Sequence, residues 1–394
     1  MSRIREHHRL LVMIGLVTSV QIGALMVGTS VSAQTAEGWE IEFTGGFGDL
    51  TTAMIWSLAE FDGSLYAGTH SVGGCRVLAR GTYPSRSAWG VLVSDGWGDA
   101  SNLAATSMEE FTYTLVNPIT ALYVGTLNHT DGGEIWQYNQ GVWYPFNAAG
   151  FGDSSNYMIT ALEAFADKLF AGTANSTTGA EIWNFSGITW YSAMTGGFGN
   201  SANSRISSLE TFNGKLYAST LEPGGGEIWE SPDGFNWSRA IPDVLLDDSG
   251  SIGVNALASA GGALYALVDG LNGLRVWQIA PGTPIQDSTS GFGDSLNDTN
   301  GTMVSFGDEL YVGTQNMATG AQIWRLRGGT WTKENTNGFI DSYNSVALAM
   351  AVFDDRLVVG TINTAEGAEL WRLPVILADG FESGGFQGWD LAAP

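Results

Sequence analysis

The chain has 394 residues, with 54 glycines, 15 tryptophans and only 14% charged residues. Long amphipathic helices need more Lys and Glu, whereas many short strands joined by tight turns suit this composition. The formal charge of −24, from 40 acidic and 16 basic residues, repels a phosphate backbone, so we expect no nucleic-acid partner.

The first 33 residues have the pattern of an export signal. Arg3, Arg5 and Arg9 make a positive start, the stretch from Leu10 to Val31 carries no charge, and Ala33 ends a small-residue cleavage site. The alternative is an uncleaved anchor, because 22 uncharged residues can span a bilayer. We expect removal of residues 1–33, no membrane span afterwards, and a secreted, periplasmic or cell-surface location.

From Trp39 onward the chain repeats itself. Each copy carries a segment like LYAGT and, 13 or 14 residues later, a segment like EIW, so that the pattern is LYxGTxNxxxGxEIW. The EIW tryptophans are Trp136, Trp183, Trp229, Trp277, Trp324 and Trp371, spaced by 46 to 48 residues, and Leu78 takes this place in a further copy. Seven copies are therefore present. About seven extra residues near 112–120 predict a longer loop in the second copy.

Each copy contains four short β-type runs, which in the third are MITALEAF, KLFAGT, AEIWNF and ITWYSA. A period near 47 with four strands per unit is typical of a β-propeller. We therefore expect an all-β, seven-bladed β-propeller of four-stranded antiparallel blades over residues 38–373.

The order of elements predicts how the ring closes. Trp39 stands seven residues before Gly46, the spacing of outer-strand tryptophans elsewhere, yet no blade precedes it. We expect residues 38–43 to be an N-terminal outer strand that completes the last blade. The alternative is VILADGF from the C-terminus, since Gly385 lies 47 residues after Gly338. If the N-terminal strand completes the last blade, residues 374–394 are a tail. Its DGFESG and later Trp resemble the endings of some bacterial exported proteins.

One predicted face displays GFGD-type turns. Their acidic residues, one per turn, are Asp49, Asp99, Asp153, Asp294 and Asp341. A ring of carboxylate oxygens suits calcium, the one cofactor that the sequence suggests. The alternative is that these side chains bond backbone amides and build the turns.

The same face displays T-x-N loops between the second and third strands. Their asparagines are Asn128, Asn175, Asn316 and Asn363. Amide groups at a shared rim suit sugar hydroxyls, while the turn-building role applies to them equally.

Two histidines depart from the repeat. His70 and His129 lie in second-to-third-strand loops of adjacent copies, and Asp131 is close to His129 in sequence. Such residues suit binding of a ligand or transition metal, or general-base chemistry with a carboxylate partner. Two exposed loop histidines without a role are the alternative.

ESPDGFNW, from Glu230 to Trp237, resembles the Asp-box hairpin of sialidase-type propellers. That motif is structural in the family, and no arginine triad for sialidase chemistry is evident. The third-strand IW is similar to that of WD40 repeats, but the GH and WD dipeptides are missing, as are the kelch double glycines.

These patterns favour a non-catalytic secreted or surface-attached module that binds carbohydrate or protein on the face of the GFGD and TxN loops. An exported polysaccharide hydrolase or lyase is the first alternative, against which stands the lack of an asymmetric carboxylate pair. A structural domain of an envelope complex is the second. No catalytic residue can be named.

Overall fold

The structure is a computed structural model that describes residues 35–36, 38–81, 89–114, 117–222, 224–242 and 253–373. The chain divides into two compact units, residues 1–34 and residues 35–394. The expected signal (1–33) and tail (374–394) lie outside the described residues. Within the described ranges, no helix has the length and hydrophobicity needed to cross a bilayer.

Almost all regular structure is β. The strands are β1 (Thr35–Ala36), β2 (Trp39–Phe43), β3 (Met54–Phe61), β4 (Ser64–His70), β5 (Val77–Gly81), β6 (Gly90–Val93), β7 (Ala104–Thr114), β8 (Pro118–Leu127), β9 (Ile135–Asn139), β10 (Val142–Pro145), β11 (Met158–Phe165), β12 (Lys168–Ala174), β13 (Ile182–Phe185), β14 (Trp190–Met194), β15 (Arg205–Phe212), β16 (Lys215–Leu221), β17 (Ile228–Ser231), β18 (Ser238–Arg239), β19 (Val254–Ala260), β20 (Ala263–Val268), β21 (Arg275–Ala280), β22 (Ile285–Gln286), β23 (Asp298–Phe306), β24 (Glu309–Gln315), β25 (Ile323–Arg327), β26 (Thr330–Lys333), β27 (Asn344–Phe353), β28 (Arg356–Asn363) and β29 (Leu370–Arg372). Single-turn helices precede several first strands: α1 (Gly45–Gly48), η1 (Ala149–Gly152), η2 (Gly196–Gly199), η4 (Ser290–Gly293) and η5 (Asn337–Ile340).

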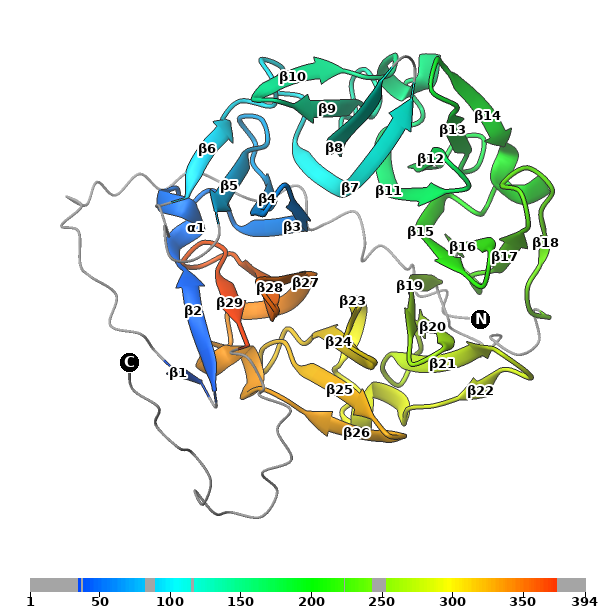
Figure 1. The fold of residues 1–394 in the computed structure, drawn as a ribbon. Helices are drawn as coiled ribbons and strands as arrows, with labels where there is room; N and C mark the ends of the chain where they lie inside the picture. The colour runs from blue at the N-terminus through cyan, green and yellow to red at the C-terminus, as the bar shows by residue number, and fades with distance from the viewer. Residues whose placement is uncertain are drawn as a thin grey trace, which may run out of the picture. The chain divides into compact units, whose positions relative to one another are not determined.

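Consecutive strands pair into antiparallel meanders, as the repeat predicts. The groups are β3 to β6, β7 to β10, β11 to β14, β15 to β18, β19 to β22, β23 to β26, and β27 to β29 with β2. Figure 1 shows the first strand of each group toward the middle and the last strand at the rim.

Several neighbouring sheets are joined where the second strand of one meets the first strand of the next. His70 pairs with Ala104, Leu127 with Met158, and Ala174 with Arg205. Ile362 of β28 pairs in the same way with Met54 of β3, so the last group is joined to the first. These single pairings set the ends of the first strands next to one another.

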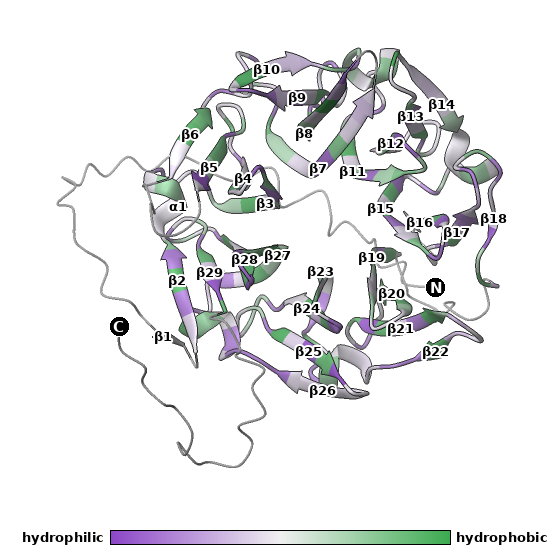
Figure 2. Cartoon of the chain, viewed as in Figure 1, coloured by the Kyte–Doolittle hydropathy of each residue, from purple (hydrophilic) through white to green (hydrophobic). Residues whose placement is uncertain are grey.

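The sheets bury both faces because each packs between two neighbours. Second strands such as β12 are buried along nearly their whole length, whereas outer strands such as β26 are mostly exposed. Figure 2 shows β3 as largely hydrophobic and the outer strands β2 and β26 as hydrophilic. The hydrophobic effect therefore acts mainly between the inner halves of adjacent sheets.

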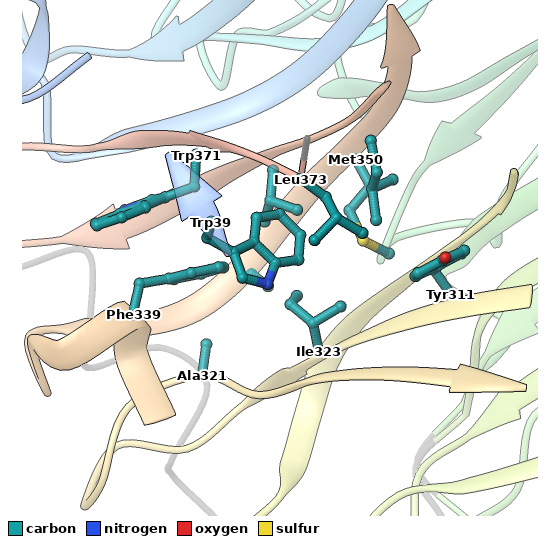
Figure 3. Packing of buried hydrophobic residues seen from close by; sticks show 11 residues of the cluster. Trp39, Tyr311, Ala321, Ile323, Phe339, Met350, Trp371 and Leu373 are labelled. Atoms are coloured by element: carbon teal, nitrogen blue, oxygen red, sulfur yellow. The ribbon is translucent and has the colours of Figure 1, made fainter. Parts of the chain in front are cut away.

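The N-terminal strand β2 pairs antiparallel with β29, with Ile41 opposite Trp371. Figure 3 shows the indole of Trp39, from β2, placed between Phe339, Leu373 and Ile323. Trp39 is fully buried and meets the ring of Phe339 edge-on at 5.0 Å between centroids.

Charged side chains reinforce this pairing. Arg372 of β29 forms ion pairs with Glu40 and Glu42 of β2, at 2.6 Å for Glu42, and Glu42 also pairs with Arg80 of β5. Ion pairs therefore join strand β2 both to β29 of the last sheet and to β5 of the first sheet.

The extra residues of the second copy do not form the longer loop that the sequence predicts. They extend the hairpin instead, because Thr112 pairs with Thr120 and Thr114 with Pro118, giving strands of 11 and 10 residues. Period-two alternation over so short a stretch is hard to separate from a loop without the partner strand.

Candidate functional site

The GFG turns hold two successive residues in the left-handed region. In η1, Gly150 has φ 54° and Phe151 has φ 56°, a conformation that costs a non-glycine residue roughly 1–2 kcal/mol. The ring of Phe151 stacks flat on Trp183 at 4.6 Å, and Phe198 stacks in the same way on Trp229. Aromatic packing on the third strand thus stabilises a strained turn.

Each turn is pressed against the loop of the preceding sheet. A Cβ added at Gly132 would lie 2.7 Å from the Cα of Gly150, and one at Gly367 would lie 2.6 Å from the nitrogen of Gly46. Gly46 donates its N–H to the carbonyl oxygen of Ala368 at 3.1 Å. The glycines are therefore required by close backbone approach, including between the last loop and the first turn.

The five turn aspartates close their own turns. Each accepts a hydrogen bond from the main-chain N–H two residues later, at 2.8 to 3.0 Å, for Asp49, Asp99, Asp153, Asp294 and Asp341. In the described ranges no three His, Cys, Asp or Glu side chains gather in a group that could hold a metal ion. Asp99, Asp294 and Asp341 also accept hydrogen bonds from the Nδ2 of Asn128, Asn316 and Asn363. The structure thus gives the expected calcium ring no support, because these carboxylates are already used as acceptors within the protein.

The loop asparagines, which the sequence offers either as sugar ligands or as turn builders, make their hydrogen bonds within the protein. All four are fully buried: Asn128, Asn175, Asn316 and Asn363. In Asn175, Nδ2 donates to Asn156 at 3.0 Å and Oδ1 accepts from the N–H groups of Thr177 and Thr178 at 2.9 Å. The other three make the same bonds. These amides build the loop.

The asparagines that lie three residues after the turn aspartate or asparagine organise this polar core. Asn156 Nδ2 donates to the carbonyl oxygen of Gly150 at 3.0 Å and to Glu181 at 2.8 Å, while its Oδ1 accepts from Thr173. Glu181 also accepts from the indole of Trp183 at 2.8 Å. The arrangement recurs at Asn102, Asn203, Asn297 and Asn344. In each of these sheets, the asparagine therefore links the turn before the first strand to the second and third strands by hydrogen bonds.

The two histidines each lie against an aromatic ring. His70, at the end of β4, is half-buried beside Trp56 at 6.3 Å between centroids, and burial lowers its pKa. His129 is exposed and stacks on Tyr157 at 4.7 Å. Asp131 is exposed in the same loop. In the described residues these three form no metal-binding group.

Trp56 and Tyr157 nevertheless share one apolar support. Both pack against a buried group at the strand ends: Ala104, Leu127, Met158 and Ala174. The structure thus brings the two histidine–aromatic pairs to the same support, although they belong to different sheets.

A cation and a carboxylate that the sequence analysis missed extend this group. Arg205, the first residue of β15, is close enough to Tyr157 and Asp269 for their charges to affect its pKa, although burial dominates and lowers it. Its Nε is buried without a hydrogen-bond partner. We call Trp56, His70, His129, Tyr157, Arg205 and Asp269 the strand-start cluster.

Asp269 is the most buried member, with 1% of its surface exposed. Asn255 donates to its Oδ1 at 2.5 Å. Burial raises the pKa of Asp269 to about 7; the Asn255 hydrogen bond and the charges of Arg205 and Arg275 lower it, and Asp298 raises it. This carboxyl therefore changes charge near neutral pH.

The repeat contains the signal that could have located this cluster. Trp56 occupies the bulge position of β3, where β7 has Thr106 and β11 has Thr160. Arg205 stands where β11 has Met158, because Arg205 pairs with Ala174 at the end of the preceding second strand just as Met158 pairs with Leu127. Comparing inner-strand positions across copies, in addition to the loops, would have singled out these residues.

Three carboxylates lie further along the first strands of successive sheets. Glu163 accepts from the N–H of Thr211 at 2.9 Å, Glu210 from Ser259 at 2.9 Å, and Glu109 from Ala164 at 3.3 Å. Burial raises the pKa of Glu163 to about 8 and that of Glu109 to about 7, and it raises that of Glu210 as well. Each therefore links two sheets as a hydrogen-bond acceptor.

The hairpin that resembles an Asp-box folds around one carboxylate. Asp233 accepts from the N–H groups of Asn236 at 2.8 Å and Phe235 at 2.9 Å, and these bonds lower its pKa. A Cβ at Gly234 would meet the ring of Phe170 at 2.2 Å. The hairpin is thus fitted to the neighbouring sheet, in agreement with a structural role.

No protein-family model and no curated protein matches the chain. Among solved structures, the WD40 repeats of RRP9 have a TM-score of 0.56 at 9% identity, covering 88% of this chain and 99% of that one. The WD40 β-propeller domain of Doa1 has a TM-score of 0.52 at 11% identity, covering 85% of this chain and 97% of that one.

A mutant of Aleuria aurantia lectin in complex with α-methyl-L-fucoside has a TM-score of 0.48 at 14% identity, covering 73% of this chain and 96% of that one. A likeness of that size bears on no ligand here. The two WD40 likenesses, together with the antiparallel meanders, show that this chain has an all-β, β-propeller-like repeat fold.

Proposed function

We propose that residues 38–373 form a seven-bladed β-propeller closed by β2, and that the exported protein is a non-catalytic module that binds carbohydrate at the strand-start cluster. Support for the ring comes from the pairing of β2 with β29 and of β28 with β3. The outer strand supplied from the N-terminus completes the group that otherwise ends at β29.

The observation that carries the binding role is the pair of aromatic stacks on one apolar support. Trp56 lies beside His70 and Tyr157 beneath His129, and both Trp56 and Tyr157 contact the same buried group. Partly exposed aromatic rings offer large apolar faces with polar edges, which suits the faces and hydroxyls of sugar rings. The blade does not need Trp56, since other sheets have threonine there.

A glycan array tests this function. The wild-type protein should be retained on a subset of glycans, and Trp56→Ala and Tyr157→Ala should each reduce retention at least tenfold. Phe235→Ala removes an exposed aromatic side chain of the Asp233 hairpin and is the matched control, expected to bind as the wild type does. Unchanged retention of both cluster variants would overturn the assignment of the site, and no retention of the wild type on any glycan would overturn the function.

A polysaccharide hydrolase or lyase is the second candidate. It is favoured by one observation, the row of Glu109, Glu163 and Glu210, whose raised pKa values suit a general acid. Release of reducing ends from a bound polysaccharide, abolished by Glu163→Gln, would support the enzyme over the binding module.

A further inference from the structure

We propose that the strand-start cluster recognises the carboxylate of an acidic saccharide, with the guanidinium of Arg205 as the anion-binding group and the hydroxyl of Tyr157 beside it. This inference rests on the proposed function and deepens it, because it names the ligand class as uronate-containing glycans.

The Nε of Arg205 is buried and has no hydrogen-bond acceptor. No ion pair within 4 Å joins Arg205 to a carboxylate in the described residues, although the charge of Asp269 is near enough to act on its pKa. Arg372, Arg325 and Arg327 each form an ion pair with a glutamate, although the Nε of Arg325 also makes no hydrogen bond. A buried charged donor without an acceptor costs more than a neutral one, so an acceptor supplied by a ligand would be strongly favoured.

The main chain at Arg205 is held by hydrogen bonds on both sides. Its main chain pairs with Ala174 on one side and with Leu221 on the other, and Asn175 donates its N–H to the carbonyl oxygen of Ser204 at 2.8 Å. The start of β15 is therefore fixed by both neighbouring strands. A fixed main chain and a buried Nε leave this side chain less freedom to lose when its guanidinium binds a carboxylate.

A hydroxyl donor and an aromatic ring lie next to the guanidinium of Arg205. Burial raises the pKa of Tyr157, so its phenol stays protonated at neutral pH and can donate a hydrogen bond. His129 stacks on the Tyr157 ring and is itself exposed, which places an aromatic face at the same spot. A charged group that binds the carboxylate and a ring face that packs on the sugar are then adjacent.

The architecture of the blade does not require an arginine at position 205. The equivalent position of β11 is Met158, which is buried among apolar side chains, and β27 has Val346. A protein with a formal charge of −24 also has no general attraction for anions. Selective binding of an acidic sugar therefore needs a local cation, and Arg205 supplies one.

Isothermal titration calorimetry with matched ligands tests the inference. The probes are oligomers of galacturonate, mannuronate and hyaluronan, each compared with its methyl ester, which keeps the sugar and removes the charge. The wild-type protein should bind at least one acidic oligomer at least tenfold more tightly than its ester. Arg205→Met, which places the β11 residue in β15, should abolish this preference.

Two further variants separate charge recognition from folding. Arg205→Lys keeps the charge without the planar fork and should show intermediate affinity. Arg327→Met removes a largely exposed arginine of β25 and should leave the preference intact. Thermal unfolding of all variants identifies any loss that is due to misfolding, in which case Arg205→Lys alone decides.

The outcomes distinguish the inference from the function on which it rests. Equal binding of acid and ester, or an acid preference that survives Arg205→Met, overturns the inference while the carbohydrate-binding function stands. Retention on no acidic or neutral saccharide overturns both. An acid preference that is lost with Arg205 supports both, and its weakening with added salt is expected for a charged contact.

Discussion

The indole nitrogen of Trp39 donates a hydrogen bond to the main-chain carbonyl oxygen of Glu334 at 2.8 Å. Trp190 makes the same contact with Phe146 at 2.9 Å, and Trp331 makes it with Asp287 at 3.2 Å. Those two are outer-strand tryptophans that reach back to the preceding sheet. Trp39 therefore takes the position of the outer-strand tryptophan in the last sheet, although in sequence it precedes the first sheet.

Trp39→Ala is expected to lower the free energy of unfolding by about 3–5 kcal/mol, the usual cost of removing a buried tryptophan. The side chain is fully buried and holds β2 against Phe339 and Leu373. Chemical denaturation followed by tryptophan fluorescence measures the loss. Phe235→Ala, at an exposed aromatic position, is the control. A loss below about 1 kcal/mol would show that β2 contributes little to stability, contrary to the range for buried tryptophan.

Asn344→Ala should cost more stability than Asn297→Ala at neutral pH. Both side chains are fully buried and bond a turn carbonyl, but the second acceptor is the Glu369 carboxylate for Asn344 and the neutral Gln322 for Asn297. Stranding a buried charge costs more than stranding an amide, and the neutral case alone costs roughly 1–3 kcal/mol. Denaturation of the two variants side by side gives the difference, and equal losses would contradict the role of the charge.

The stability of the protein should fall as pH rises through the range in which Glu163 ionises. Burial raises its pKa from 4.5 to about 8, with Glu109 and Glu210 adding to the rise, so the neutral form is favoured by folding. That contribution is complete below pH 4.5 and is lost as pH rises through about 8, at a rate of roughly 1.4 kcal/mol per pH unit while the folded group remains protonated.

Glu163→Gln should flatten this pH profile, because the amide is neutral at every pH. Midpoints of urea unfolding at pH values from 5 to 9 would reveal it. Glu60→Gln, at an exposed position of β3, should keep the wild-type slope. A Glu163→Gln profile as steep as that of the wild type would assign the slope to other groups.

Binding of an acidic oligosaccharide should weaken as pH rises through about 7, where Asp269 ionises next to Arg205. Below that pH the Asp269 carboxyl is neutral, so the positive charge of Arg205 is available to the carboxylate of the ligand. Above that pH the Asp269 carboxylate competes with the ligand for Arg205. Arg275 and Asp298 also act on Asp269, and neither is changed in the test. Calorimetric titrations at pH 6 and pH 8 should differ for the wild-type protein and agree for Asp269→Asn, which should bind tightly at both. A pH dependence that persists in Asp269→Asn would rule out this carboxyl as its source.

Much of the architecture follows from the sequence because it is written in local and periodic signals. The four β-type runs of each copy reappear as antiparallel meanders, and the GFG and TxN segments form the tight turns that their glycines and asparagines predict. The sequence left open whether Asn175 and its equivalents bind a ligand or build their loops, and in the structure all four are buried and bonded within the protein. Burial depends on the neighbouring sheet, which one copy read alone does not contain.

The sequence by itself determined the all-β class, the 47-residue unit, and the special position of Trp39, because hydrophobic alternation and turn residues act over a few positions. Only the tertiary structure decided that Arg205, Tyr157 and Asp269 are neighbours and that the Nε of Arg205 is buried without a hydrogen-bond acceptor. Those residues come from three different sheets. Their proximity arises from the hydrogen bonds that join the end of each second strand to the start of the next first strand, a contact that sequence spacing does not encode.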